Sequence, residues 1–252
     1  MRFKQVILKV GVFDEDKRSK SEFWIEFDPQ NRFQLSNNRL LLPFIASTAA
    51  SIAAPFYIHH MIPKCSSMAA PSGRIPVFEE SNYLQASVKA CDRYMKQVPR
   101  EKWTAWDIRE PNLPARVKRM SRVCWACSNP MNRTSNRMFP SISLRDVMRS
   151  IDHFDLVDID AQGMDVELVV SLGDLVSKVK RFKIECQTPT ETVNNEPYWL
   201  YKTTVPNDCG IATRFLSSYG FVVEKLEMNN CACEEQNLYM VFRNHSKAPR
   251  TR

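Results

Sequence analysis

The segment DIDAQGMD at residues 158–165 contains side chains whose types and spacing could do chemistry. Its aspartates, glutamine and glycine directly follow the mainly apolar residues 154–157, which predict a buried strand. A carboxylate at the tip of a strand can hold a cation or accept a proton. The same residues also suit an ordinary turn between a strand and a helix. An active-site edge, a metal site and a turn are therefore the alternatives for this segment.

The residues of this segment differ in their expected roles. Asp165 stands near the start of the next predicted helix, where exposed N–H groups favour a carboxylate, so helix capping is its expected role. Gly163 is expected to allow a tight turn. Asp160 is the most suitable site residue, because ligands of open α/β sheets bind beyond the carboxyl ends of the strands.

The elements that must position this segment alternate along the last hundred or so residues of the chain. β-branched and apolar runs predict strands at residues 154–160, 181–187, 221–227 and 237–243. Helical spacing predicts helices at residues 143–151, with Ser143 as N-cap, at 165–179, and at 210–220, with Gly220 just past the end. This alternation predicts an α/β domain with a mainly parallel sheet, whose final strand pair is antiparallel and closes one edge.

The first sixty residues predict further strands, and one uncharged stretch among them needs a separate interpretation. Strands are expected at residues 5–13, 23–29, 44–51 and 54–60. The 19 uncharged residues 40–58 are long enough to cross a membrane as a helix. Two prolines, several hydroxyl side chains and much alanine instead favour a buried strand and a tight connection. We therefore expect no membrane span.

The net charge of +7 favours anionic partners without identifying them. Between Arg116 and Arg149 there are eight Lys or Arg residues and a single acid, Asp146. This stretch could bind RNA or an anionic acceptor such as a phosphorylated or sulfated sugar. A solvated basic face is the expected interpretation, so nucleic acid is not the expected partner.

The eight cysteines raise the question of metal binding and of redox state. Cys124 and Cys127 form a C-x-x-C pair, and Cys231 and Cys233 form a C-x-C pair. The pairs lie far apart in the sequence and C-x-C is not a standard zinc spacing, so no metal site is expected. The start MRFKQVILKV lacks the long apolar region of a secretory signal. Unpaired thiols and a cytoplasmic location are therefore expected.

Residues 154–187, FDLVDIDAQGMDVELVVSLGDLVSKVKRFKIECQ, resemble the FkbM-type methyltransferases. Those proteins have an I-D-x-[EQ]-G-x-[DE] turn, a helix, and a strand that ends in an E-x-Q-like element. Further matches follow in chain order: FDP at 27–29, IASTAAS at 45–51, APFYI at 54–58, CSSM at 65–68 and LSSYGFVVEKLE at 216–227. The resemblance covers about residues 5–70 and 140–243.

The resemblance implies a class I, Rossmann-like methyltransferase fold. It implies a single domain over residues 1–243, with a basic insertion around 85–140. Residues 244–252 are separately expected to form a disordered basic tail. S-adenosylmethionine would be the cofactor, and the reaction would move its methyl group to a hydroxyl oxygen of a small molecule, sugar or other glycan. That acceptor can be anionic.

The resemblance also implies which residues bind the cofactor. Gly11 stands where the cofactor turn begins, and Asp28 would hold the ribose hydroxyls. Residues 49–51, among them Ala50 and Ser51, would lie near the adenine end.

The remaining assignments concern the acceptor side. Asp160 would face the methionine or acceptor end, and Glu185 would line the acceptor side, which makes these two carboxylates the predicted catalytic residues. Gln162 and His59 are the predicted substrate-binding residues.

One difference from the family supports an alternative function. The family has a glycine-rich turn after the first strand, whereas here Gly11 is followed by the bulky Val12 and Phe13. Asp158 also replaces a lysine that often precedes the I-D pair. The alternative is a catalytically inactive relative that binds an anionic ligand or a protein partner.

Overall fold

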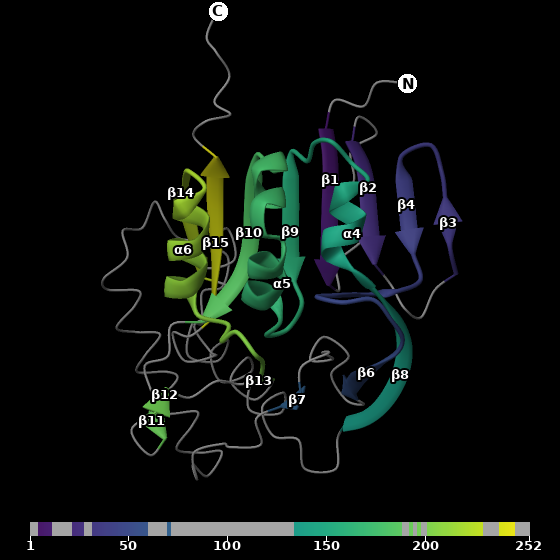
Figure 1. Ribbon diagram of the computed structural model, residues 1–252, viewed down its shortest axis with the longest axis horizontal. Coiled ribbons are helices and arrows are strands. Elements are labelled where there is room, and N and C mark those ends of the chain that lie inside the picture. The colour runs from purple at the N-terminus through teal and green to yellow at the C-terminus, as the bar shows by residue number, and fades with distance from the viewer. Residues whose placement is uncertain are drawn as a thin grey trace, which may run out of the picture.

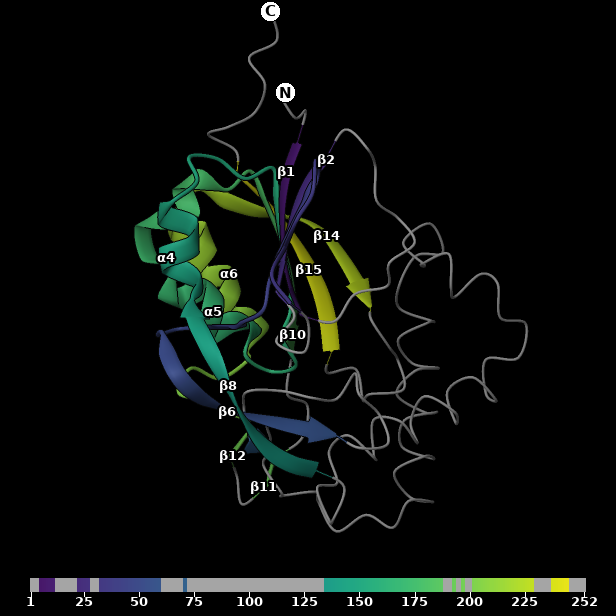
Figure 2. The same ribbon diagram turned by 90° about the vertical axis from the view of Figure 1, so that its right-hand side faces the viewer.

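The structure of the 252-residue chain is a computed structural model. It describes residues 5–11, 22–27, 32–59, 70–71, 134–187, 192–193, 196–197, 201–228 and 237–244. Both close cysteine pairs and most of the basic stretch lie outside these residues. The largest feature is an eight-stranded sheet, with helices α4, α5 and α6 on one of its faces (Figures 1 and 2).

The large sheet has the order β14-β15-β10-β9-β1-β2-β4-β3. Its strands are β1 (Gln5–Gly11), β2 (Glu22–Phe27), β3 (Gln34–Leu35), β4 (Arg39–Leu42), β9 (Leu156–Asp160), β10 (Arg181–Gln187), β14 (Phe221–Met228) and β15 (Asn237–Asn244). All of them run in the same direction except β3 and β15. The predicted α/β fold is confirmed, with its mainly parallel sheet and an antiparallel C-terminal pair at one edge.

The order of the parallel strands reverses beside β1. The chain adds β2 and β4 on one side of β1 and then β9 and β10 on the other. Such a reversal leaves a crevice between the two central strands at their carboxyl ends, where ligands of open α/β sheets bind. Gly11, the last residue of β1, is paired with Asp160, the last residue of β9. The two segments that the sequence assigned to a site therefore meet at this point.

The two faces of the large sheet differ because successive side chains of a strand point to opposite faces. The face toward the helices is apolar and buried, and its residues include Leu8, Val10, Ile25, Phe27, Val157, Ile159, Phe182, Ile184 and Phe242. The other face carries charges in register, where Lys9 is paired with Asp158, and Asp158 with Lys183. A slip of one residue would bury these charges under the helices, so the pattern determines the register.

A smaller sheet of three strands, in the order β5-β8-β6, lies on the side of the large sheet at which β1, β9 and β10 end (Figure 1). It consists of β5 (Ile45–Ser47), β6 (Ser51–His59) and β8 (Thr134–Ser143). The strands predicted at 44–51 and 54–60 are confirmed in part, as β5 and β6 of this smaller sheet, whereas β4 takes the place next to β2 in the large sheet. The remaining short strands are β7 (Ala70–Pro71), β11 (Thr192–Val193), β12 (Glu196–Pro197) and β13 (Tyr201–Lys202).

The uncharged residues 40–58 thus contribute to strands β4, β5 and β6. Within the described ranges, no helix has both the length and the apolar character needed to cross a membrane.

The helices are α4 (Leu144–Arg149), α5 (Asp165–Ser171) and α6 (Cys209–Ser218), and a 3-10 helix, η4, follows α5 at Gly173–Lys178. Ser143 is the N-cap of α4 as predicted, although its side chain makes no capping hydrogen bond. The single helix predicted at 165–179 was wrong, because Gly173 takes the left-handed conformation, with a φ of 57°, and ends the α-helical path. Gly220 follows α6 with a φ of 82°, as predicted.

The side chain of Arg145 stabilises the end of α5 before Gly173. Its guanidinium donates to the carbonyls of Ser171, at 3.4 Å, and Leu172, and it forms an ion pair with Asp174 at 2.9 Å. These bonds satisfy carbonyls that the end of α5 leaves without a partner in its own helix.

Replacing Gly173 by alanine should lower the free energy of unfolding by about 2 kcal/mol. A Cβ there would lie 2.7 Å from Arg145 Nη1, so the guanidinium would have to move away from the carbonyls that it binds. The left-handed backbone would be strained as well. Gly220→Ala is the matched control, since Gly220 is also left-handed but a Cβ there meets nothing within 4 Å. This variant should lower the free energy of unfolding, measured in urea, by about 1 kcal/mol. Equal losses for the two variants would contradict the role of Arg145.

Candidate functional site

Asp160 and Glu185 come together at the carboxyl edge of the large sheet through the side chain of Gln162. Gln162 Nε2 donates to Asp160 Oδ1 at 2.7 Å and to Glu185 Oε2 at 3.3 Å. Asp160 ends β9, and Glu185 lies near the end of the neighbouring strand β10. We call Asp160, Gln162 and Glu185 the β9–β10 cluster. Its two carboxylates could bind a cation or accept a proton from a hydroxyl group.

The turn after β9 holds Gln162 in an unusual backbone conformation. Gln162 has a φ of 49° and Gly163 has a φ of 94°. A left-handed non-glycine residue costs about 1–2 kcal/mol, so other bonds must hold it in place. Asp165 provides them: its Oδ1 accepts the N–H of Ala161 at 3.0 Å, and its Oδ2 accepts the N–H of Gly163 at 3.1 Å.

The expected role of Asp165 in helix capping was wrong. Met164 is the N-cap of α5, and the Asp165 carboxylate accepts hydrogen bonds from the turn that precedes the helix. Its side chain is completely buried. Burial raises the pKa of Asp165 well above its ordinary value, the charge of Asp160 raises it further, and the hydrogen bonds from the backbone oppose both effects.

The raised pKa of Asp165 predicts a pH dependence of stability. The folded state binds the proton of Asp165 more tightly than the unfolded state does. The resulting stabilisation is fully present below the ordinary pKa of 3.8 and is lost as the pH rises through the raised folded pKa. Asp165→Asn has no proton to lose. The free energy of unfolding of the parent minus that of Asp165→Asn should therefore fall as the pH rises above 3.8. Urea unfolding at several pH values measures this difference, and a difference that grows with pH would contradict the prediction.

The predicted cofactor residues are only partly described. Gly11 lies opposite Asp160, as noted above. Ala50 is exposed and Ser51 begins β6, so both lie in the smaller sheet or beside it. Asp28 lies outside the described residues, directly after Phe27 in the sequence.

The predicted substrate residue His59 is the last residue of β6, where it is paired with Thr134 of β8. It therefore belongs to the smaller sheet, and its side chain lies outside the described part of the structure.

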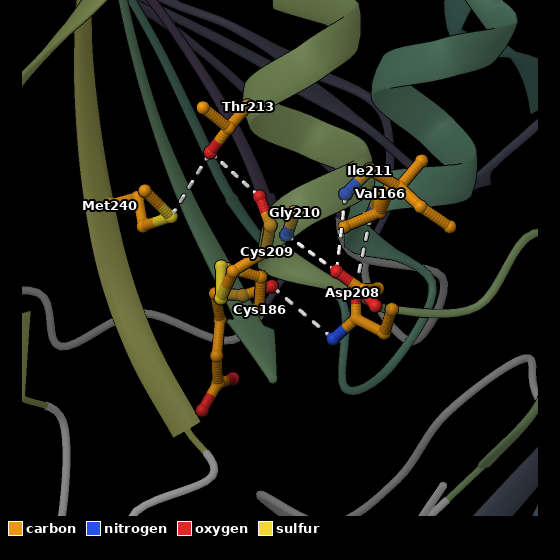
Figure 3. The surroundings of a disulfide bond; sticks show 10 residues. Val166, Cys186, Asp208, Cys209, Gly210, Ile211, Thr213 and Met240 are labelled. Atoms are coloured by element: carbon orange, nitrogen blue, oxygen red, sulfur yellow. Dashed lines mark hydrogen bonds between the residues drawn. A yellow bond between two sulfur atoms is a disulfide. The ribbon is translucent and has the colours of Figure 1, made fainter. Parts of the chain in front are cut away.

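Two cysteines near the β9–β10 cluster form a bond that the sequence did not predict. Cys186, next to Glu185 in β10, forms a disulfide with Cys209, the first residue of α6, with a Cα–Cα distance of 5.0 Å (Figure 3). The expectation of unpaired thiols was wrong for these two residues. Disulfides are uncommon in the reducing cytosol, and the expected cytoplasmic location stays a prediction. The pairing could not be read from the spacing, since the fold alone brings the start of α6 to the end of β10.

Asn207 is a second residue that the sequence reasoning missed. Its side chain is buried, and its Oδ1 accepts the N–H of Val166 at 3.0 Å. Its Nδ2 donates to the carbonyl of Glu185 at 3.3 Å. No motif marks this residue, because both of its partners are backbone groups from other parts of the chain.

Among the described residues, no group of three or more His, Cys, Asp or Glu side chains could hold a metal ion. Both of the close cysteine pairs considered for zinc lie outside this part of the chain.

Comparison of the chain with family models, curated proteins and solved structures gives no significant match.

Proposed function

We propose that this chain is an S-adenosylmethionine-dependent O-methyltransferase of the FkbM type, with the Rossmann-like fold of class I methyltransferases. The β9–β10 cluster carries the proposal, because its Asp160 lies opposite Gly11 at the switch point of the sheet. Numbered along the chain, the strands β4, β2, β1, β9 and β10 stand in the order 3-2-1-4-5, as in the sheets of Rossmann folds.

The charge of the β9–β10 cluster suits this cofactor. S-adenosylmethionine carries a sulfonium and an ammonium cation, which the carboxylates of Asp160 and Glu185 attract. Gly11 has no side chain at the end of β1, so the backbone there permits close approach of a ligand. The assignment of Asp28 to the ribose hydroxyls rests on the sequence resemblance.

The positions of the two carboxylates suggest separate roles. When bound, the cofactor supplies an electrophilic methyl group. Asp160 is next to the end of β1, so it orients the cationic end of the cofactor. Glu185 is one strand further from β1 and accepts the proton of the acceptor hydroxyl. Gln162 donates to both carboxylates and keeps the base at a constant distance from the cationic end.

The acceptor is proposed to be a hydroxyl group of a small molecule or glycan. An anionic group of that acceptor must bind away from the β9–β10 cluster, because the carboxylates there would repel it. The alternative function is an inactive relative that binds an anionic ligand or a protein partner, and an anionic ligand would meet the same repulsion at this edge.

The proposal is tested by titrating the chain with S-adenosylmethionine and S-adenosylhomocysteine in a calorimeter. Binding of S-adenosylmethionine in the micromolar range is expected, and it should weaken with added salt because charges contribute to it. The absence of heat at millimolar ligand would contradict the proposal.

Asp160→Asn should weaken binding of S-adenosylmethionine by about tenfold, which corresponds to about 1.4 kcal/mol. The effect on S-adenosylhomocysteine should be smaller, because that ligand lacks the sulfonium charge. Asp146→Asn is the matched control, since Asp146 is an exposed aspartate on α4 that pairs with Arg149. Equal losses for the two ligands would show that Asp160 does not interact with the sulfonium.

A further inference from the structure

Asn207 connects α5 and β10, two elements that adjoin the β9–β10 cluster. Its side chain joins the first turn of α5, through the N–H of Val166, to the carbonyl of Glu185 in β10. Its own carbonyl accepts the N–H of Gln187 at 2.7 Å, which adds a second bond to the end of β10. The side-chain amide of Asn207 thus uses its oxygen for Val166 and its nitrogen for Glu185.

These contacts concern the same elements that meet in the β9–β10 cluster. Val166 directly follows Asp165, whose carboxylate fixes the turn that carries Gln162. Glu185 is the carboxylate that Gln162 contacts on the other strand. Gln162 thus joins the side chains of Asp160 and Glu185, and Asn207 joins the backbone of Glu185 to the start of α5.

The disulfide holds Asn207 in this position. Cys209 lies two residues after Asn207 and is bonded to Cys186, which stands between Glu185 and Gln187. Asp208 between them caps α6 by accepting the N–H groups of Gly210 and Ile211 (Figure 3). Residues 206–209 are therefore tied to β10 by a covalent bond and to α6 by a cap.

We propose that Asn207 is a positioning residue of the β9–β10 cluster and that the Cys186–Cys209 disulfide is required to keep it in place. The binding part of this inference rests on the proposed function. A requirement for the disulfide makes ligand binding sensitive to a dithiol reductant. Such a reductant gives two electrons and two protons to the disulfide, which becomes two thiols, while the dithiol itself becomes a disulfide. Cys209 is then no longer bonded to β10.

The first arm of the test compares Asn207→Ala with Asn244→Ala. Asn244 is a matched control, because it is also a buried asparagine but lies at the opposite end of the sheet, where its N–H donates to the carbonyl of Lys180. Asn207→Ala should weaken S-adenosylmethionine binding by about tenfold in calorimetry and speed hydrogen exchange at residues 161–166. Asn244→Ala should leave both unchanged. Asn207→Asp keeps an acceptor for Val166 and should restore part of the affinity.

The second arm uses the reductant. A dithiol should weaken S-adenosylmethionine binding to the parent while the far-ultraviolet circular dichroism stays unchanged. The double variant Cys186→Ser/Cys209→Ser should bind weakly with or without the dithiol.

Two outcomes overturn the inference: unchanged affinity in Asn207→Ala, or an equal loss in Asn244→Ala. If the parent itself binds no S-adenosylmethionine, the proposed function fails separately. Hydrogen exchange then still decides the inference. Residues 161–163, which form the turn that the Asp165 carboxylate holds, must exchange faster in Asn207→Ala than in Asn244→Ala.

Discussion

Glu185→Gln should lower the rate of methyl transfer by about 10²–10³-fold, with little change in the free energy of unfolding. A general base contributes this much when it accepts a proton in the transition state, and an amide cannot do so. Glutamine has the same shape and keeps a carbonyl oxygen for the hydrogen bond from Gln162 Nε2, which is 3.3 Å from Glu185 Oε2. The sheet should therefore stay intact.

This result is measured as transfer of a labelled methyl group to a panel of hydroxylated small molecules and glycans, together with thermal unfolding. Glu224→Gln is the matched control, because Glu224 is an exposed glutamate on the edge strand β14 that pairs with Arg243. Its rate should equal that of the parent. Full activity in Glu185→Gln would remove Glu185 from the role of base, and an equal loss in Glu224→Gln would show that the effect is not local.

Removing the disulfide should have the largest effect on stability. The double variant Cys186→Ser/Cys209→Ser should lose about 3 kcal/mol of unfolding free energy, because the bond closes a loop across 23 positions and restricts the unfolded chain. For a chain of this size the midpoint of thermal unfolding should fall by about 6–12 °C.

The control for this variant is chemical reduction. A dithiol should lower the unfolding midpoint of the parent, and the double variant should lose less on reduction than the parent does. Alkylation of the unreduced protein followed by mass spectrometry should find Cys186 and Cys209 unmodified. Alkylation of both residues in protein from its natural source would contradict the disulfide.

Local patterns in the sequence were enough to predict most of the large sheet. The strand predicted at 181–187 is β10 with the same bounds, and Gly220 follows α6 as expected. These features depend on alternation of apolar side chains and on a left-handed glycine, which act within a few residues.

Predictions failed where partners far along the chain decide the structure. The third strand of the parallel set is β4 at Arg39–Leu42, whereas the predicted strand at 44–51 contributes Ile45–Ser47 and Ser51 to the smaller sheet. Both segments are apolar, so composition could not tell which of them pairs with β2. The end of α5 at Gly173 likewise depends on Arg145, which lies in a different helix.

The sequence by itself determined the mainly parallel α/β fold and the types of residue in the β9–β10 cluster. Only the tertiary structure decided that Gln162 joins Asp160 to Glu185, that Asp165 holds the turn instead of capping a helix, and that two cysteines are bonded. The physical reason is the range of the interactions. Apolar periodicity is local, whereas hydrogen bonds to buried backbone groups and the pairing of thiols require atoms that only the folded chain brings together.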